Sequence, residues 1–218
     1  MVDVTHGTLS LRERKKLRTR AVLIDAAVDL CLKHGYQQTT VEQIAASADV
    51  SARTFSRYFP TKDAVFMTLL DDYLHEVAIE LTAVDGDVGP LEALRQAHAS
   101  VLTRVATRRA GRLTSERIVL TLRVINASES LKKSAFELRP DLTYELLARR
   151  MGTTADDPRV RLVDVVFSAA VIEACGDLVD DTDTVRLGPT IVLDRMNEAL
   201  AQVALMARGL QCEAAAHG

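Results

Sequence analysis

The sequence predicts an all-α protein of about nine helices, with a three-helix head at the N-terminus and a larger helical domain after it. Apolar residues recur three and four positions apart in nearly every segment longer than ten residues, as on one face of a helix. β-branched residues occur singly, without the alternation that is typical of strands. A turn-forming run at 85–90, Asp-Gly-Asp-Val-Gly-Pro, separates the head and the helix after it from the rest of the chain.

The first helix is expected over 10–34. Its apolar stripe at helical spacing consists of Leu17, Ala21, Ile24, Val28 and Cys31. Gly35 is expected to end the helix, because glycine adopts the left-handed backbone of a helix C-terminus at little steric cost. The N-terminal half is a basic arm, made up of Arg12, Arg14, Lys15, Lys16, Arg18 and Arg20.

Two short helices joined by a tight turn are expected over 40–59. Thr40 and Gln43 form a capping box, in which each side chain binds the other residue's free backbone N–H. The second helix should therefore begin at this point. Its inward-facing residues are expected to be Val41, Ile44, Ala45 and Ala48.

The turn between the two short helices is expected at 49–50, and Ser51 caps the third helix. Pro60 ends that helix, because the residue before a proline avoids helical backbone. Thr61 then caps a long fourth helix. The apolar set of this helix includes Ala64, Val65, Leu69, Leu70, Tyr73, Leu74 and Val77.

Five further helical segments are expected in the larger domain, separated by turn-forming residues. They are 91–107, 112–126, 130–151, 158–178 and 186–210. Pro140 lies inside the third of these, so that segment should bend or begin a new helix near Arg139.

The formal net charge of -3 hides an uneven distribution along the chain. Residues 1–62 hold ten Lys and Arg against six Asp and Glu, whereas residues 63–218 hold seventeen against twenty-four. The head is therefore the candidate for contact with a polyanion such as DNA.

The composition argues against several other classes of protein. No apolar run of about 18 residues occurs, and no apolar stretch follows the basic N-terminal residues, so we expect a soluble, cytoplasmic protein without a membrane partner. The three cysteines, Cys31, Cys175 and Cys212, form no C-x-x-C pair and lie near no histidine at ligand spacing. Cys31 and Cys175 are expected to be small buried hydrophobes. Neither a metal site nor a cofactor is expected.

The exposed face of the third helix carries the chemistry of DNA recognition. Phe55 and Phe59 lie four residues apart and share the buried face. On the other faces, guanidinium groups can bind guanine edges and hydroxyl groups can bind phosphate oxygens. The residues expected to contact bases are Arg53, Thr54 and Arg57, and those expected to contact phosphates are Thr40, Ser51, Ser56, Tyr58 and Lys62. The two caps among them could be purely structural, and the tyrosine and the lysine could be ordinary surface residues.

These features resemble the TetR family of bacterial transcriptional regulators. The matching runs are Leu-Cys-Leu-Lys-His-Gly-Tyr at 30–36, Thr-Thr-Val-Glu-Gln-Ile-Ala at 39–45, Ala-x-Val-Ser at 48–51 and Arg-Tyr-Phe-Pro-Thr-Lys-Asp at 57–63. The run from 51 to 62 is most similar to the actinobacterial branch that includes the mycofactocin regulator MftR, whose members are associated with acyl-CoA-like ligands. The resemblance implies a DNA-binding domain over 10–77, with a helix-turn-helix motif at 40–59, and a ligand-binding and dimerisation domain over 78–212.

Two positions depart from the family pattern. Many members have glycine where this chain has Arg53, so this arginine is expected to add base readout. Many members have an aromatic residue, often a tyrosine that contacts phosphate, where this chain has Ser56. The operator sequence therefore does not carry over from relatives.

The resemblance also implies a homodimer that binds a palindromic or pseudo-palindromic double-stranded DNA operator. Family members pair through their last two helices, which here correspond to 158–178 and 186–210. The apolar stripes available for pairing are Val163, Val166, Phe167 and Ala170 in the first, and Ile191, Leu200, Val203 and Ala207 in the second. The alternative is that these stripes pack only within one chain.

The same resemblance implies a repressor that leaves its operator when a small hydrophobic or acyl-CoA-like effector binds among the middle helices. The candidate effector-binding residues are Leu120, Thr121, Val124, Phe136, Tyr144, Leu147, Phe167, Val171 and Cys175. The helix at 62–83 joins head and body, so effector binding is expected to shift it and to change the spacing of the two recognition helices.

Two other classes of function are weighed against this one. An enzyme is not expected, because the chain contains no G-x-S-x-G, no H-E-x-x-H and no phosphate-binding glycine loop. Glu173 and Asp177 flank a cysteine, but an acid pair near a helix end is typical of a solvated edge. A helical protein–protein interaction module remains the alternative, although it would leave the basic arm and the exposed arginines without a role.

Overall fold

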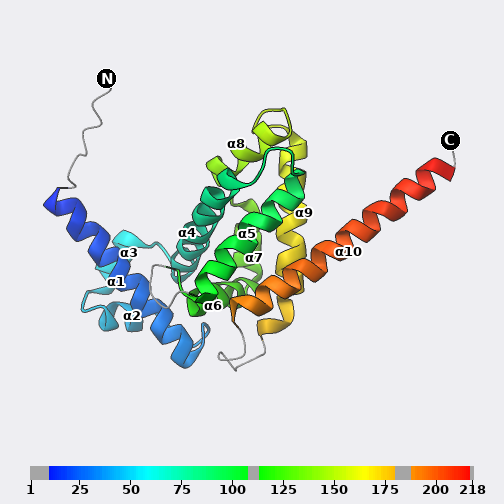
Figure 1. Cartoon of the computed structure of the whole chain (residues 1–218). Helices are drawn as coiled ribbons and strands as arrows, with labels where there is room; N and C mark the ends of the chain where they lie inside the picture. The colour runs from blue at the N-terminus through cyan, green and yellow to red at the C-terminus, as the bar shows by residue number, and fades with distance from the viewer. Residues whose placement is uncertain (1–9, 108–112, 180–187, 217–218) are drawn as a thin grey trace, which may run out of the picture. The chain divides into compact units, whose positions relative to one another are not determined.

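The structure is a computed structural model that describes residues 10–107, 113–179 and 188–216, with the side chains of 178–179 and 209–216 outside the description. Within these ranges all regular secondary structure is helical, with ten α-helices and one short 3₁₀-helix (Figure 1). The prediction of an all-α protein is confirmed. By its internal contacts the chain divides into two compact units, Met1–Val65 and Phe66–Gly218.

The first unit contains three helices and the first turn of a fourth. They are α1 (Leu11–His34), α2 (Val41–Ser47), α3 (Ala52–Tyr58) and the start of α4 (Lys62–Ala83). Hydroxyl residues begin all three of the complete helices: Ser10 and Thr40 form capping boxes, and Ser51 accepts a backbone N–H from the first turn of α3. The predicted starts of these helices are confirmed. The unit boundary lies within α4, and the domain boundary expected at residue 77 lies further along the same helix.

The two tight connections of this unit each use a left-handed residue. Gly35 ends α1 with a φ of 82°, and its N–H donates to the Cys31 carbonyl at 2.9 Å. Asp49 has a φ of 53° in the turn between α2 and α3, a conformation that aspartate tolerates better than most residues. The N–H of Val50 then donates to the Ala45 carbonyl at 2.9 Å and closes the turn.

The apolar stripe expected along α1 is only partly buried. Leu17 is 51% exposed and Ala21 is exposed. Burial begins at Leu23 and continues through Ile24, Ala26, Ala27, Val28 and Cys31. At 1.5 Å per residue α1 is about 36 Å long, whereas α2 and α3 are each about 10 Å long. The two short helices cannot cover all of α1, so its N-terminal half remains an exposed arm.

The second unit contains the rest of α4 and seven further helical elements. They are α5 (Pro90–Thr107), α6 (Ser115–Asn126), α7 (Glu129–Glu137), α8 (Asp141–Arg150), α9 (Pro158–Ala174), η1 (Gly176–Val179) and α10 (Pro189–Ala216). Pro140 is the N-cap of α8 and separates it from α7, which accounts for ten α-helices where about nine were expected. The expected helix starts at 112 and 186 lie outside the described residues.

One apolar core joins α4, α5, α6, α8, α9 and α10 of the second unit. It includes Val77, Leu81, Ala97, Val101, Leu147, Val160, Phe167 and Met196, which come from α4, α5, α8, α9 and α10. The side chain of Arg150 on α8 reinforces this arrangement. Its guanidinium donates to the carbonyls of Val84 and Val88 at 3.0 Å, and also to that of Asp85, so it holds the connection between α4 and α5.

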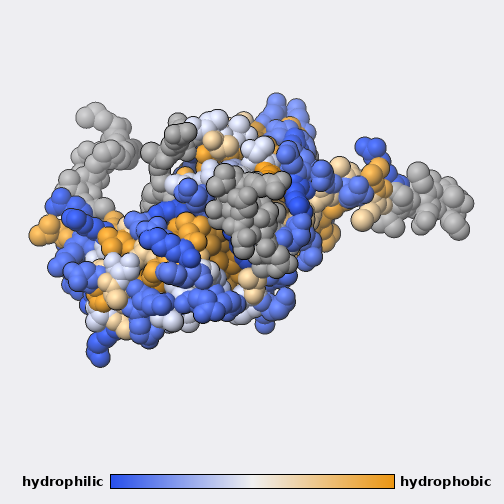
Figure 2. All heavy atoms as spheres, turned by 90° about the horizontal axis from the view of Figure 1, so that it is seen from below, coloured by the Kyte–Doolittle hydropathy of each residue, from blue (hydrophilic) through white to orange (hydrophobic). Residues whose placement is uncertain are grey.

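The stripes expected to pair two chains contribute largely to the core of one chain. Phe167 and Leu200 are buried, and Val163, Ala170 and Ile191 pack against the same core. The large apolar side chains that α9 and α10 leave exposed are Leu162 (61%), Leu205 (57%) and Met206 (69%). Figure 2 shows apolar atoms among polar ones along the part of α10 that projects from the body. None of the helices in the described ranges is long and apolar enough to cross a membrane.

Candidate DNA-binding surface and ligand cavity

Two buried aromatic residues fix the orientation of α3. Phe55 and Phe59 have almost no exposed surface, and their ring centroids lie 5.8 Å apart at an angle of 45°. The guanidinium of Arg20 on α1 lies 5.4 Å from the centroid of the Phe59 ring. Because one face of α3 is anchored in this way, its other faces are directed to solvent.

The arginines predicted to read bases lie on the exposed part of α3. Arg53 and Arg57 are both exposed. The Arg57 guanidinium lies 5.4 Å from the centroid of the half-buried Tyr58 ring, a cation–π geometry that restrains it. No hydrogen bond or ion pair involves Arg53 within the described part of the chain. Its guanidinium fork is therefore available to an acceptor pair on a base edge.

The hydroxyl groups of α3 are more occupied than the arginines. Ser51 accepts from the Thr54 N–H at 3.1 Å, and the two hydroxyls lie 3.0 Å apart within hydrogen-bonding distance. Ser56 donates its O–H to the Ala52 carbonyl at 3.1 Å. A phosphate oxygen can only accept, so Ser56 would have to break this bond to contact phosphate. Among the predicted phosphate contacts of α3, Ser56 is the weakest.

Thr40 lies at the N-terminus of α2 and remains exposed. Its hydroxyl accepts from the Gln43 N–H at 3.2 Å, and its own N–H donates to the Gln43 side chain at 2.8 Å. The hydroxyl proton is not used in this capping box. Thr40 can therefore cap the helix and donate to a phosphate at the positive end of the helix dipole.

Lys62 lies in a cluster that the sequence did not reveal. Its ammonium donates to the carbonyls of Tyr36 at 2.6 Å and Thr39 at 2.8 Å, and it lies 3.9 Å from the centroid of the Tyr36 ring. The Tyr36 hydroxyl donates to Asp63, and burial together with this carboxylate raises the pKa of Tyr36. Two of the three ammonium protons are thus used inside the head. We call Lys62, Tyr36 and Asp63 the loop clamp, because they hold the start of α4 to the loop after α1.

The basic arm of α1 lies beside the turn of the helix-turn-helix motif. A shallow surface groove is lined by Leu11, Arg14, Lys15, Arg18, Thr19 and Val22 from α1, and by Ala48 and Val50 from the turn. The basic residues of the arm and the turn of the helix-turn-helix motif therefore line the same surface groove.

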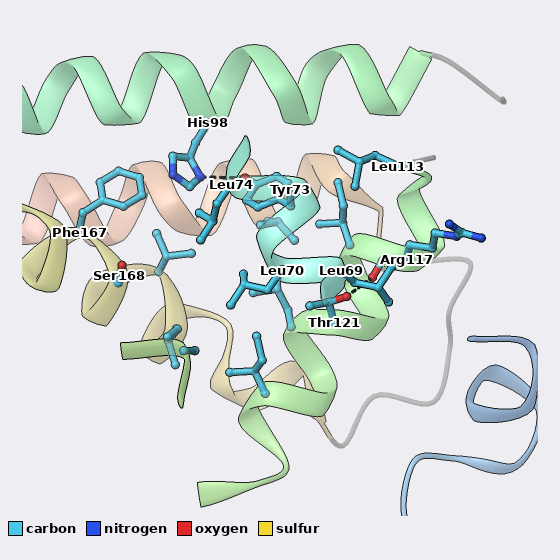
Figure 3. Close-up of a pocket in the computed structure, with 17 residues that line it drawn as sticks. Leu69, Leu70, Tyr73, Leu74, His98, Leu113, Arg117, Thr121, Phe167 and Ser168 are labelled. Atoms are coloured by element: carbon cyan, nitrogen blue, oxygen red, sulfur yellow. Dashed lines mark hydrogen bonds between the residues drawn. The ribbon is translucent and has the colours of Figure 1, made fainter. Parts of the chain in front are cut away.

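The second unit contains a cavity of about 80 Å³ among α4, α5, α6 and α9 (Figure 3). It is lined by Leu69, Leu70, Tyr73, Leu74, His98, Leu113, Arg117, Ile118, Thr121, Leu122, Ile125, Ala135, Phe167, Ser168, Val171, Ile172 and Val192. Twelve of these 17 side chains are hydrocarbon. An apolar pocket with a few polar groups is the usual form of a small-molecule site.

A polar pair, the buried His98 and the partly buried Tyr73, forms part of the cavity wall. The Tyr73 hydroxyl and Nδ1 of His98 lie 2.8 Å apart, and the imidazole centroid lies 4.5 Å from that of the Phe167 ring. Burial lowers the pKa of His98 to about 3, so the imidazole is neutral at physiological pH. Burial also raises the pKa of Tyr73. Across the cavity, Thr121 donates its hydroxyl proton to the Arg117 carbonyl at 2.7 Å.

Three of the nine residues predicted to bind an effector line this cavity, namely Thr121, Phe167 and Val171. The other six do not: Leu120, Val124, Tyr144, Leu147 and Cys175 are buried elsewhere, and Phe136 is half-buried. Tyr144 instead donates to Asp164 on α9 at 2.9 Å. Burial raises the pKa of the Cys175 thiol to about 11, which disfavours the nucleophilic thiolate at neutral pH.

Helix geometry explains the difference on α6. Thr121 shares its face with Ile118 and Ile125, three and four residues away, and all three line the cavity. Leu120 and Val124 are four residues apart on a different face. The residues that the sequence analysis missed, above all Tyr73 and His98, come from α4 and α5. The signal available in the sequence was a histidine at the helical spacing of apolar residues, since Leu94 and Val101 lie four residues before and three residues after it. A polar residue on a buried face is more informative than an apolar one.

The head and the body both match known proteins. The sequence pattern described as "Bacterial regulatory proteins, tetR family" matches residues 23–68. Over 164 residues the chain is 33% identical to the HTH-type transcriptional regulator TcmR of Streptomyces glaucescens, a match that spans 73% of this chain and 72% of TcmR. The mycofactocin biosynthesis regulator MftR of Mycobacterium tuberculosis is 29% identical over 84 residues, or 38% of this chain and 42% of MftR. This match is shorter than that to TcmR, so closeness to the MftR branch stays a prediction.

One solved structure supports the fold beyond the head. Thermus thermophilus FadR, a TetR family transcriptional repressor in complex with lauroyl-CoA, aligns with a TM-score of 0.54 and 22% sequence identity. The alignment covers 84% of this chain and 91% of the FadR chain. At this level of identity the similarity establishes the fold of the helical body, and no more.

Proposed function

The chain belongs to the TetR family of bacterial regulatory proteins, and we propose that it is a repressor that a small apolar effector releases from its operator. The matched relatives are transcriptional regulators, so the chain is a DNA-binding regulator and not an enzyme. The observation that carries the proposal is the anchoring of α3 by Phe55 and Phe59, which leaves Arg53 and Arg57 exposed on a head that also carries a basic arm. A cytoplasmic location follows from this role.

In the proposed complex α3 enters the major groove and the arginines read bases. Arg53 is the principal reader, because its fork is free and lies in the first turn of the helix. Arg57 and Thr54 contribute less, since one is restrained by Tyr58 and the other is bonded to Ser51. Thr40, Ser51, Tyr58 and the remaining proton of Lys62 hold the phosphate backbone and set the register.

The operator should be palindromic because the protein should act as a homodimer. Leu162 on α9 and Leu205 and Met206 on α10 are large apolar side chains exposed on the two helices through which the family pairs. Burial of these residues against a second copy would remove them from water. Two recognition helices would then meet half-sites separated by about one helical turn of DNA, roughly 34 Å, or more.

Release by an effector would act through α4. This helix carries two residues of the loop clamp in its first turn and contributes Leu69, Leu70, Tyr73 and Leu74 to the cavity. The cavity of about 80 Å³ is smaller than the engineered cavity of about 150 Å³ that holds benzene. An effector of one ring or more would therefore have to move the cavity walls, including α4, in order to bind. A coupling of about 1 to 3 kcal/mol would lower operator affinity roughly 5- to 150-fold.

An acyl-CoA-like effector is the second candidate, because FadR, which has a similar fold, was solved in complex with lauroyl-CoA. The small volume of the cavity favours a smaller apolar molecule. The two candidates differ in charge, because coenzyme A carries phosphates and the cavity lining offers little to neutralise them.

Selection from a randomised duplex library with the full-length protein tests the DNA-binding part of the proposal. We expect enrichment of a two-fold symmetric sequence. Affinity for that duplex should fall steeply with salt, by about 10³ to 10⁵ between 50 and 200 mM if 6 to 10 phosphates are contacted. A flat salt response without symmetric enrichment would contradict the proposal and favour a protein-binding module.

A further inference from the structure

The cavity in the second unit has almost no means of neutralising a charged ligand. Twelve of its 17 lining side chains are hydrocarbon, and none is a carboxylate. The single cationic residue in the lining is Arg117, and Figure 3 shows its guanidinium directed away from the other labelled residues. Burial of an unpaired charge costs far more free energy than burial of a hydrogen-bonded neutral group.

The polar pair in the wall offers one adaptable hydrogen-bonding position. The hydroxyl of Tyr73 can donate to Nδ1 of His98 or accept from it. In the first arrangement Nε2 carries the imidazole proton and is a donor, and in the second arrangement it is an acceptor. Within the part of the chain that the structure describes, His98 forms no hydrogen bond besides the one to Tyr73. Nε2 thus has capacity for a partner of either kind.

Besides the pair and Arg117, the lining carries two hydroxyl groups, those of Thr121 on α6 and Ser168 on α9. The hydroxyl of Thr121 already donates to the Arg117 carbonyl in its own helix. Tyr73 of the pair lies on α4, the helix that continues into the head, and Phe167 of α9 packs on the imidazole of His98. A ligand that engages the pair would therefore contact α4 directly through Tyr73.

We propose that this cavity selects an uncharged, largely apolar molecule that hydrogen-bonds to the Tyr73–His98 pair through one oxygen. The inference rests on the proposed effector function of the cavity and names its ligand class. Phenols and neutral ketones of about one ring belong to this class. Carboxylates do not, and the charged part of a coenzyme A thioester would have to remain outside the cavity.

The inference is tested by calorimetric titration of the full-length protein at pH 7.5 with phenol, toluene and benzoate. These three probes share one aromatic ring and differ in a hydroxyl, a methyl and a carboxylate group. The informative quantity is the ratio of phenol affinity to toluene affinity. Both probes move one aromatic ring from water into the cavity, so the free energy of that transfer largely cancels in the ratio. In His98→Leu this ratio should fall roughly 5- to 50-fold, since the buried phenol hydroxyl loses its partner. Benzoate should bind the unmodified protein at least about 100-fold more weakly than phenol.

Two further variants guard the interpretation. Tyr73→Phe retains the ring and removes only the hydroxyl, so it should lower the same ratio by a smaller factor. Thr121→Val is the matched control on the opposite wall and should leave the ratio unchanged, because its hydroxyl is already bonded within α6. Circular dichroism shows whether each variant is folded. If His98→Leu does not fold, the affinity ratio of Tyr73→Phe is used for the test.

Three results would overturn the inference: an unchanged ratio in His98→Leu with an unchanged ratio in Tyr73→Phe, benzoate binding within a few-fold of phenol, or no binding of either neutral probe. Operator affinity measured with and without phenol distinguishes a failure of the ligand-class inference from a failure of the proposed release by an effector. If phenol binds with the expected preference and operator affinity does not change, release by an effector is wrong and the ligand class stands. If operator affinity changes but benzoate binds as well as phenol, the ligand class is wrong and the regulator stands.

Discussion

The head and the cavity use polar side chains in opposite ways. On the head, the aromatic residues Phe55 and Phe59 are buried and the arginines they position are exposed, where water solvates them until DNA replaces it. In the cavity, His98 is itself buried and bonds to Tyr73, which is partly buried. Exposed cations suit a polyanion of high charge density, and a neutral pair suits a molecule without charge. The difference teaches that the two sites should respond differently to salt, to pH and to truncation.

The largest effect should come from the buried anchor of the head. Phe55 is completely buried, so Phe55→Ala should destabilise the head by about 3 to 5 kcal/mol through lost contacts and a cavity. Thermal unfolding measures the loss of stability, and DNA binding should disappear with the orientation of α3. Phe55→Leu is the control and should retain most of the stability. Full DNA binding by Phe55→Ala would contradict the view that buried residues position the exposed ones.

Removal of an exposed reader should affect binding and leave stability intact. Arg53→Ala should weaken operator binding by about 1 to 3 kcal/mol and relax base preference at one position in each half-site. Thermal unfolding should stay within about 0.5 kcal/mol of the unmodified protein, since Arg53 is a surface residue. The measurement is fluorescence anisotropy with operator and random duplexes, with Arg57→Ala as the matched comparison. An unchanged ratio between the two duplexes would show that Arg53 does not read a base.

Acidification should destabilise the body through His98. The folded state keeps this histidine neutral with a pKa of about 3, whereas the unfolded chain protonates it below about pH 6.5. Below that pH the unfolded state binds more protons, so stability falls as pH decreases from about 6.5 towards 3 and does not change above 6.5 on account of this residue. At pH 5 the loss should be about 2 kcal/mol.

Unfolding measured at pH 7.5 and pH 5 for the protein and for His98→Leu isolates this contribution. The difference between the two pH values should be smaller in the variant by that amount. His75→Gln serves as the control, because His75 is exposed. Equal pH sensitivity in all three proteins would mean that His98 is not held neutral in the fold.

The smallest effect separates a positioning role of Lys62 from direct contact with phosphate. Lys62→Met keeps an unbranched chain and removes the ammonium that bonds to Tyr36 and Thr39, so stability should fall by about 1 to 2 kcal/mol. Because one ammonium proton remains for DNA, the slope of affinity against salt should decrease by no more than about 1. A lowered slope with unchanged stability would assign Lys62 to phosphate contact alone.

Much of the head could be predicted from the sequence because its determinants are local. The capping box at Thr40 and the cap at Ser51 involve residues three apart, and the phenylalanine pair involves residues four apart. Gly35 and Pro60 likewise act on their own backbone. The loop clamp was missed because it joins Tyr36 to residues 26 and 27 positions later, a distance over which no periodicity operates.

What the sequence determined by itself was the all-α class, the positions of most helices and the identity of the exposed side chains on α3. Only the tertiary structure decided which residues line the cavity and which hydroxyl groups are already hydrogen-bonded within the protein. Tyr73, His98, Thr121 and Phe167 come from four helices, and their proximity depends on how those helices are rotated about their axes. Adjacent residues of a helix point about 100° apart. A prediction that is wrong by one residue about which face is buried therefore exchanges a cavity residue such as Thr121 for a core residue such as Leu120. Local rules fix where a helix begins and ends, but packing against the other helices fixes which of its faces is buried.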